Sequence, residues 1–185
     1  MAGATGAIWV IAETSADGTL AKSSSEVATL AQTLAEAAGT TAAGIVVASD
    51  PTAAAEELSG YVGRVVAVAE PGVHGHAWAQ IAAQRAAAIL TSESPAAILT
   101  GAGPDGRDVA GTLAAVLERP VLVNATAVTW QDGAPSVEMS VFGGKLLTTS
   151  TFADGEWGIV TVRPNVVTAA KASEVSVSPT ARINR

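Results

Sequence analysis

One stretch of sequence decides the fold: AAILTGAGPDGRDVAG, residues 96–111. It begins as an apolar run, turns through three glycines and opens into the helical pattern of residues 109–117. A buried strand that ends in a glycine-rich turn before a helix is typical of parallel α/β sheets. The stretch therefore predicts a strand, a tight turn and a helix whose N-terminus faces the turn.

The glycine turn is the candidate binding site. Gly101, Gly103 and Gly106 permit unusual backbone angles and leave no Cβ in the way of a close approach. We expect Asp105 to cap the helix. The free N–H groups of such a helix end attract anions, and Arg107 adds a bidentate donor. The candidate cofactor-binding residues are Gly103, Asp105, Gly106 and Arg107.

The three glycines also spell G-x-G-x-x-G, the dinucleotide-binding fingerprint. In a true fingerprint the turn follows the first strand, and an acidic residue that binds the ribose comes about 20 residues later. Here the turn follows the fourth predicted strand, and the residues around Asn124 include no carboxylate. A tight strand-to-helix turn without a ligand is therefore the preferred interpretation of the pattern alone.

Strands and helices alternate on both sides of this stretch. Continuous apolar runs predict buried strands, and apolar residues at helical intervals predict the helices between them. The strands are expected at residues 7–12, 41–49, 64–69, 96–100 and 120–123, and the helices at residues 23–38, 50–58, 78–89 and 109–117. This order predicts a Rossmann-like three-layer α/β/α fold with a mainly parallel sheet.

Two of these helices carry sequence signals for their starts. Ser23 and Glu26 have the spacing of a capping box, and Gly39 is expected to end that helix. For the next helix, Asp50 is predicted as the N-cap residue and Pro51 as the first helical residue.

The pattern changes after Asn124. Strand-like runs at residues 128–130, 137–142, 145–152 and 157–162 are joined by Gly-Gly and Asp-Gly turns. We expect an antiparallel β segment that belongs to the same domain, residues 1–167. Residues 168–185 are polar without a periodic apolar face, and we expect a tail or linker.

Composition excludes several functions. The chain has 185 residues, 49% of them hydrophobic, with a net charge of −7, no cysteine and no basic patch. This balance argues against a nucleic-acid partner, and the absence of cysteine excludes thiolate chemistry. No apolar run reaches the length of about 20 residues that a membrane span needs, and Met1–Gly6 lacks a basic signal-peptide start. We expect a soluble, cytoplasmic protein.

The sequence offers no catalytic set. His74 and His76 lie in a glycine loop near Glu70, but no third ligand has zinc spacing, so a solvated loop is preferred over a metal site. Neither a G-x-S-x-G elbow nor a phosphate-binding G-x-x-x-x-G-K-[ST] loop occurs. We therefore expect a chain that is not an enzyme.

Four segments together resemble the alpha subunits of electron transfer flavoproteins. G-R-D-V-A-G-T-L-A-A at residues 106–115 is similar to the family's G-R-D-L-A-P-R-L-A-A. S-V-F-G-G-K-L at 140–146 is similar to its Y-G-G-K-A segment, V-R-P-N at 162–165 to its V-R-P-N, and W-V-I-A-E at 9–13 to its opening strand. The order and the spacing also match, so the resemblance covers about residues 8–167.

The resemblance implies a function that the residues alone do not. In this family the alpha subunit has an N-terminal Rossmann-like domain and a C-terminal domain that holds most of the FAD contacts. It pairs with a beta subunit of related fold that in many members binds AMP. The heterodimer carries electrons from dehydrogenases such as the acyl-CoA dehydrogenases of fatty acid beta-oxidation to a membrane quinone reductase. It does so in the bacterial cytoplasm or, in eukaryotes, in the mitochondrial matrix.

The sequence departs from the family pattern at its end. It stops at Arg185, where the FAD domain would begin, so residues 168–185 are interpreted as a linker toward a missing FAD-binding domain. We expect FAD in the full heterodimer and no tightly bound cofactor on this chain. Residues 103–107 are then a vestigial anion site or a surface for the partner subunit.

A universal-stress-type nucleotide-binding module is the alternative. Such a module has a G-x-x-G followed by G-[ST] late in the chain, which residues 143–145 do not match.

Overall fold

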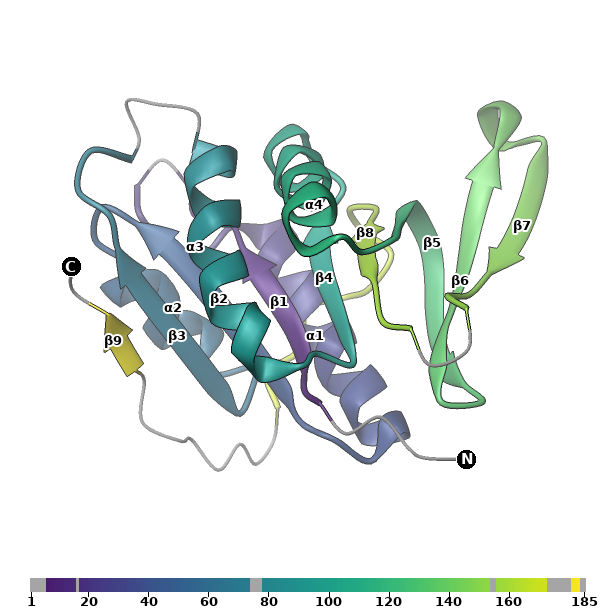
Figure 1. The fold of residues 1–185 in the computed structure, drawn as a ribbon, viewed down its shortest axis with the longest axis horizontal. Helices are drawn as coiled ribbons and strands as arrows, with labels where there is room; N and C mark the ends of the chain where they lie inside the picture. Colours follow the sequence, from purple (N-terminus) through teal and green to yellow (C-terminus); the bar gives the residue numbers. More distant parts are fainter. Residues whose placement is uncertain (1–5, 16, 74–77, 154–155, 173–180, 184–185) are drawn as a thin grey trace.

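The computed structural model describes residues 6–15, 17–73, 78–153, 156–172 and 181–183, the last three by their backbone. These residues form one nine-stranded sheet with the strand order β7-β6-β5-β8-β4-β1-β2-β3-β9 (Figure 1). The strands from β5 to β9 in this order are parallel, while β6 and β7 run antiparallel to their neighbours. The predicted fold class, a mainly parallel sheet followed by an antiparallel segment, is confirmed.

The secondary structure follows the predicted alternation closely in the first two thirds of the chain. The helices are α1 Lys22–Ala38, α2 Thr52–Leu58, α3 Trp78–Glu93 and α4 Pro104–Leu117. The strands are β1 Ile8–Ala12, β2 Ala42–Ala48, β3 Arg64–Ala69, β4 Ala97–Gly101, β5 Val121–Gln131, β6 Ala134–Val141, β7 Leu146–Ser150, β8 Ile159–Val162 and β9 Ala181–Ile183. A single 3-10 turn, η2 Phe142–Gly144, joins β6 to β7.

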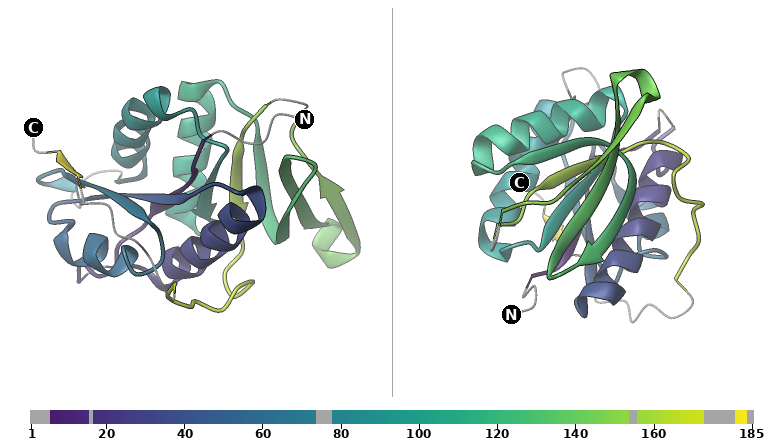
Figure 2. Two further views of the ribbon diagram at one scale, coloured as in Figure 1. Left: turned by 90° about the horizontal axis from the view of Figure 1, so that it is seen from below. Right: turned by 90° about the vertical axis from the view of Figure 1, so that its right-hand side faces the viewer.

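Helices cover both faces of the parallel strands, as the three-layer prediction requires. Helices α1 and α2 pack on one face and α3 and α4 on the other (Figure 2). Alternate residues of β1 enter the two cores: Val10 joins the α1 side and Trp9, with none of its surface exposed, the α3 side. Abundant alanine on the helices lets them lie close to the sheet. No helix in the described part of the chain is both long and apolar enough to span a membrane.

Strand β8 corrects one prediction. Residues 157–162 were expected in the antiparallel segment, but β8 lies between β4 and β5 and is parallel to both. Ile159 is paired with Ile98 on one side and with Val121 on the other. The prediction failed because all four residues of β8 are buried, and a short apolar run reads the same in either orientation.

Strand β5 corrects a second prediction, the change of structure expected after Asn124. The break expected at Asn124 is a bulge inside a single long strand, between Leu122 and Ala125 in its pairing with β8. Asn124 has a φ of 62°, the left-handed conformation that asparagine tolerates. Beyond the bulge β5 turns through Asp132 and Gly133, both at positive φ, into β6, as the Asp-Gly pair predicts.

The helix caps differ from the predictions at three helices. The N-cap residues are Ala21, Pro51 and Gly103, none with a side-chain cap hydrogen bond. The Ser23–Glu26 capping box is therefore wrong, and Asp105 lies in the first turn of α4 and is not its cap. Asp50 lies just before the N-cap of α2, where its carboxylate accepts a hydrogen bond from the Thr52 N–H at 3.0 Å. Gly39 ends α1 at a φ of 68°, as predicted.

The segment predicted as a tail makes backbone contacts with the domain. The Ala170 N–H donates to the Thr29 hydroxyl on α1, and the Ala172 N–H donates to the Gly60 carbonyl. Residues 181–183 then add β9 beside β3 at the edge of the sheet opposite to β7. The polar composition of this segment gave no sign of that pairing.

Candidate functional site

The glycine turn lies where the order in which the strands are added to the sheet reverses. Strand β1 leads through α1 to β2 on one side, whereas β4 leads through α4 on the other face to β5. The carboxyl ends of β1 and β4 meet at this switch point, which is where doubly wound α/β proteins bind their ligands. The structure therefore places the glycine turn, residues 101–106, at this switch point.

The Glu13 carboxyl group fills the inner side of the turn. A Cβ placed on Gly101 would lie 2.9 Å from Glu13 Oε1, and one placed on Gly106 would lie 2.7 Å from the same atom. The main chain of Glu13 is fixed against the start of α1, because its N–H donates to the Ser24 hydroxyl at 2.8 Å and its carbonyl accepts from the Ala21 N–H at 3.0 Å. Two of the three glycines thus make room for a side chain of the protein itself.

The Glu13 carboxyl group lacks partners that would stabilise its charged form. Burial raises its pKa above the ordinary value, and the nearby Asp105 carboxylate adds to that rise. Its Oε1 atom is buried without a hydrogen-bond partner among the described residues. An ionised Glu13 is therefore costly in the folded chain.

Glu13→Gln is expected to stabilise the protein at neutral pH. The pKa of Glu13 is higher in the folded state than its ordinary value of 4.5. Above pH 4.5 the folded state therefore binds more protons than the unfolded state, and the free energy of unfolding falls as the pH rises through the raised pKa. The glutamine removes this loss, and we expect a melting temperature higher by about 2–4 °C at pH 7, the shift that about 1 kcal/mol produces. Calorimetry from about pH 4 to pH 7 measures it. Glu56→Gln, at an exposed position on α2, is the control, and a Glu13→Gln variant no more stable than wild type at pH 7 would contradict the cost of burial.

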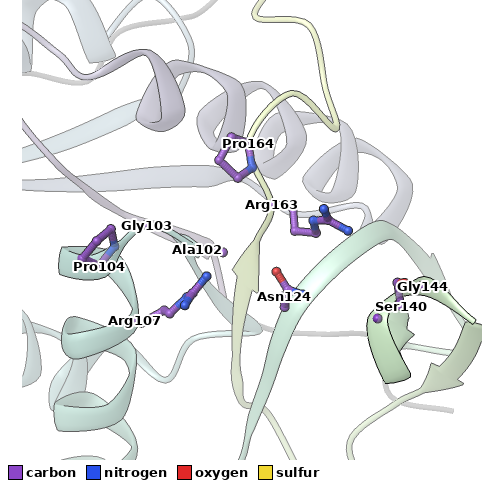
Figure 3. Close-up of a pocket in the computed structure, with 10 residues that line it drawn as sticks. Ala102, Gly103, Pro104, Arg107, Asn124, Ser140, Gly144, Arg163 and Pro164 are labelled. Carbon is purple, nitrogen blue, oxygen red and sulfur yellow. The ribbon is translucent and has the colours of Figure 1, made fainter.

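A separate hollow of about 700 Å³ lies on the outer side of the turn. It is bounded by the start of α4, the bulge of β5, the end of β8 and the η2 turn (Figure 3). Its polar side chains are those of Arg107, Asn124, Ser140 and Arg163, and its remaining walls are alanine, glycine and proline. The described residues therefore build a polar hollow without an aromatic wall.

Two of the four predicted site residues line this hollow. Gly103 and Arg107 do, while Gly106 is buried against the Gly101 carbonyl oxygen and Asp105 is exposed in the first turn of α4. Nothing in the structure tests whether an anion binds, so the anion site remains a prediction.

Sequence reasoning missed three polar residues of the hollow. Asn124 is turned by the β5 bulge, which the buried Thr161 holds: the Asn124 N–H donates to the Thr161 hydroxyl at 2.8 Å. Arg163 is placed beside it, because the Arg163 N–H donates to the Ala125 carbonyl at 3.0 Å. Ser140 comes from the end of β6. The sequence signals for these residues were an asparagine at the end of an apolar run, the S-V-F-G-G-K-L segment that begins at Ser140, and the R-P-N segment.

The prediction for the histidine loop, a solvated loop in preference to a metal site, is not tested by the structure. His74 and His76 lie outside the described residues, and Glu70 forms an ion pair with Arg85 at 2.6 Å. The Arg85 Nε–H donates a hydrogen bond to the Glu70 carboxylate, and this bond lowers the pKa of the Glu70 carboxyl.

Fold and site together define a doubly wound α/β protein with a glycine turn at its switch point and an antiparallel hairpin at one sheet edge. Residues 8–183 match the model of the electron transfer flavoprotein domain, and the chain belongs to the electron transfer flavoprotein family. This family assignment confirms the resemblance found in the sequence and favours it over a universal-stress-type module.

The relatives among curated proteins are alpha subunits. The chain is 33% identical over 161 residues to the electron transfer flavoprotein subunit alpha of Mycobacterium tuberculosis, covering 85% of this chain and 48% of the relative. It is 38% identical over 86 residues to that of Mycobacterium leprae, covering 46% of this chain and 26% of the relative. The match therefore spans about half the length of the Mycobacterium tuberculosis subunit and about a quarter of that of Mycobacterium leprae.

Proposed function

We propose that this chain forms the N-terminal scaffold of an electron transfer flavoprotein alpha subunit and pairs with a beta subunit. The family match over residues 8–183 and the alpha-subunit relatives support this proposal. On this proposal the chain is part of an electron carrier and is not itself an enzyme. Its location is the bacterial cytoplasm, or the mitochondrial matrix if the source is eukaryotic.

The observation that carries the pairing is an exposed apolar surface on the β6–β7 hairpin. Phe142, Leu146 and Leu147 are 75%, 54% and 64% exposed, and we call these three residues the hairpin surface. Consecutive strand residues point to opposite faces, so Leu146 and Leu147 are exposed on both sides of the sheet. The hairpin extends beyond the two helical layers (Figures 1 and 2).

The hairpin also ends in an unpaired edge. Strand β7 pairs only with β6 among the described strands, so the outer N–H and C=O groups of Leu146–Ser150 have no strand partner. An apolar edge strand is a surface that pairs readily with another chain. A partner subunit that covers it would satisfy these backbone groups and bury the leucines at the same time.

We propose that FAD belongs to the complete complex and is held outside the described residues. An isoalloxazine ring needs an apolar or aromatic wall, whereas the hollow beside the glycine turn is lined by small, polar and charged residues. The residues present therefore do not fit the flavin ring. Bound FAD supplies the electron carriage, and the proposed donors and acceptor are flavin dehydrogenases, such as acyl-CoA dehydrogenases, and a membrane quinone reductase.

The pairing is tested by a double variant of the hairpin surface, Phe142→Asn with Leu147→Thr. Asparagine keeps the φ of 51° at position 142, and threonine keeps the strand preference at 147. We expect the dissociation constant for the beta subunit of the same organism to rise at least about tenfold, because buried aromatic and aliphatic anchors dominate interfaces. Light scattering after gel filtration and calorimetric titration measure this change.

The matched control is Val116→Gln on α4, which changes another exposed apolar side chain without touching the hairpin. It is expected to pair like the wild type, and all three proteins are expected to melt within about 2 °C of one another. Equal affinity of the double variant and the wild type would overturn the proposed contact.

A further inference from the structure

We propose that Arg107, Asn124, Ser140 and Arg163 form a binding site for the phosphoryl group of an anionic ligand. The site is the hollow on the outer side of the glycine turn. It uses the two predicted residues Gly103 and Arg107 but adds three side chains from β5, β6 and the end of β8. It includes none of the three residues of the hairpin surface, and its test needs no beta subunit.

Two arginine side chains line this hollow. Neither Arg107 nor Arg163 forms an ion pair or a side-chain hydrogen bond with any described residue. The arginines that pair elsewhere show the contrast: Arg64 makes two 2.8 Å hydrogen bonds with Glu93, and Arg85 makes one with Glu70. In a chain with a net charge of −7, two unpaired guanidinium groups beside one hollow are available to an external anion.

The polar groups of the hollow come from opposite sides. Figure 3 shows Arg107 reaching from α4, Asn124 in the middle and Arg163 extending over β5 toward Ser140 and Gly144. The asparagine amide lies between the two arginines in this view, and the serine hydroxyl adds a further donor beyond Arg163. This set exceeds the capacity of one carboxylate and suits the several oxygens of a phosphate or pyrophosphate.

The glycine walls leave the hollow open. Gly143 and Gly144 adopt φ values of 67° and 90°, and a Cβ on Gly143 would meet no atom within 4 Å. A Cβ on Gly144 would lie 3.8 Å from the Ser140 Oγ. The η2 turn thus lines the hollow with two residues that carry no side chain.

The inner side of the turn does not compete for this ligand. Glu13 Oε2 would lie 3.9 Å from a Cβ on Gly103, and its Oε1 atom faces Gly101 and Gly106. The Glu13 side chain therefore occupies the inner side of the turn. A phosphoryl group is therefore expected on the Arg107 and Arg163 side of the turn.

The test is calorimetric titration of the 185-residue chain with pyrophosphate at low ionic strength. We expect one site per chain, with binding at least about tenfold weaker in each of Arg107→Gln and Arg163→Gln, because each removes a charge-assisted contact. Lys171→Gln removes one positive charge beside α1, outside the hollow, and is expected to bind within about twofold of wild type. Both arginines are exposed, so equal melting temperatures are expected to show that the variants remain folded.

Four results would overturn the proposal. The first three are no binding of pyrophosphate, unchanged binding by both arginine variants, and an equal loss in Lys171→Gln. Parallel titrations with inorganic phosphate, ADP and adenosine identify the source of the group. Stronger binding of ADP than of pyrophosphate assigns the site to a nucleotide, and equal or weaker binding assigns it to a free phosphate. Binding of adenosine as tight as that of ADP would also overturn the proposal, because the phosphates would then contribute nothing.

Discussion

Gly106→Ala is expected to lower the melting temperature by about 6–12 °C, the shift that about 3 kcal/mol produces in a domain of this size. A Cβ at position 106 would clash with the Gly101 carbonyl oxygen and would lie 2.7 Å from Glu13 Oε1. The first of these atoms belongs to the backbone at the end of β4 and cannot rotate away. Helix α4 must therefore shift from the sheet to accept even one methyl group.

The same helix provides the control for this substitution. Gly111 is also in α4, but a Cβ there would meet no atom within 4 Å. Gly111→Ala is expected to stabilise the chain by about 0.5–1 kcal/mol, because alanine restricts the unfolded chain and favours the helix. Thermal melts of both variants measure the difference. A Gly106→Ala variant that melts like the wild type would contradict the close contact between α4 and β4.

Trp9→Ala is expected to have an effect of similar size or larger, a loss of about 3–5 kcal/mol. The side chain has none of its surface exposed and lies on β1, between Ala43 on β2 and Ile98 on β4. Its removal leaves a cavity in the core beneath α3 and α4. We expect the urea midpoint to fall strongly, with the slope of the transition unchanged.

Trp9→Phe separates packing from the polar part of the indole. The Trp9 Nε1 atom is buried without a hydrogen-bond partner among the described residues, so phenylalanine removes an uncompensated group while it keeps an aromatic ring beneath Arg64. The loss is expected to be less than half of that in Trp9→Ala. Equal losses would show that packing around the ring does not account for the effect.

Local features of the fold could be predicted from the sequence because local chemistry sets them. The apolar run Arg64–Ala69 gives the observed bounds of β3. Gly39 ends α1 and Asp132-Gly133 forms the hairpin turn, since both depend on a positive φ that few residues adopt. The alternation of strands and helices then gives the parallel sheet.

Long-range pairing could not be predicted in this way. Strand β8 is inserted between β4 and β5, and β9 lies beside β3 after a segment of more than one hundred residues. Neither placement changes the local pattern of apolar residues. The apolar sequence of a buried strand indicates that both of its faces are covered, but it does not indicate which strands are its neighbours in the sheet.

In the candidate site, too, the residues that are close in sequence could be predicted, and those brought in by long-range pairing could not. Gly103 and Arg107 could be found because they are close in sequence and follow a strand. Asn124 and Arg163 come to the hollow only through the β5 bulge and the insertion of β8. Glu13 was missed because its role against the glycine turn depends on the pairing of β1 with β4.

Hydrogen–deuterium exchange of the β7 backbone tests the proposed pairing with a beta subunit most directly. The outward N–H groups of Leu146–Ser150 have no strand partner among the described residues and are expected to exchange rapidly in the free chain. Addition of the beta subunit is expected to slow exchange in this strand at least about tenfold, with smaller changes in α2 and β3 at the far side of the sheet. Formation of a complex in which the exchange of β7 is unchanged, or the absence of any complex, would contradict the proposal.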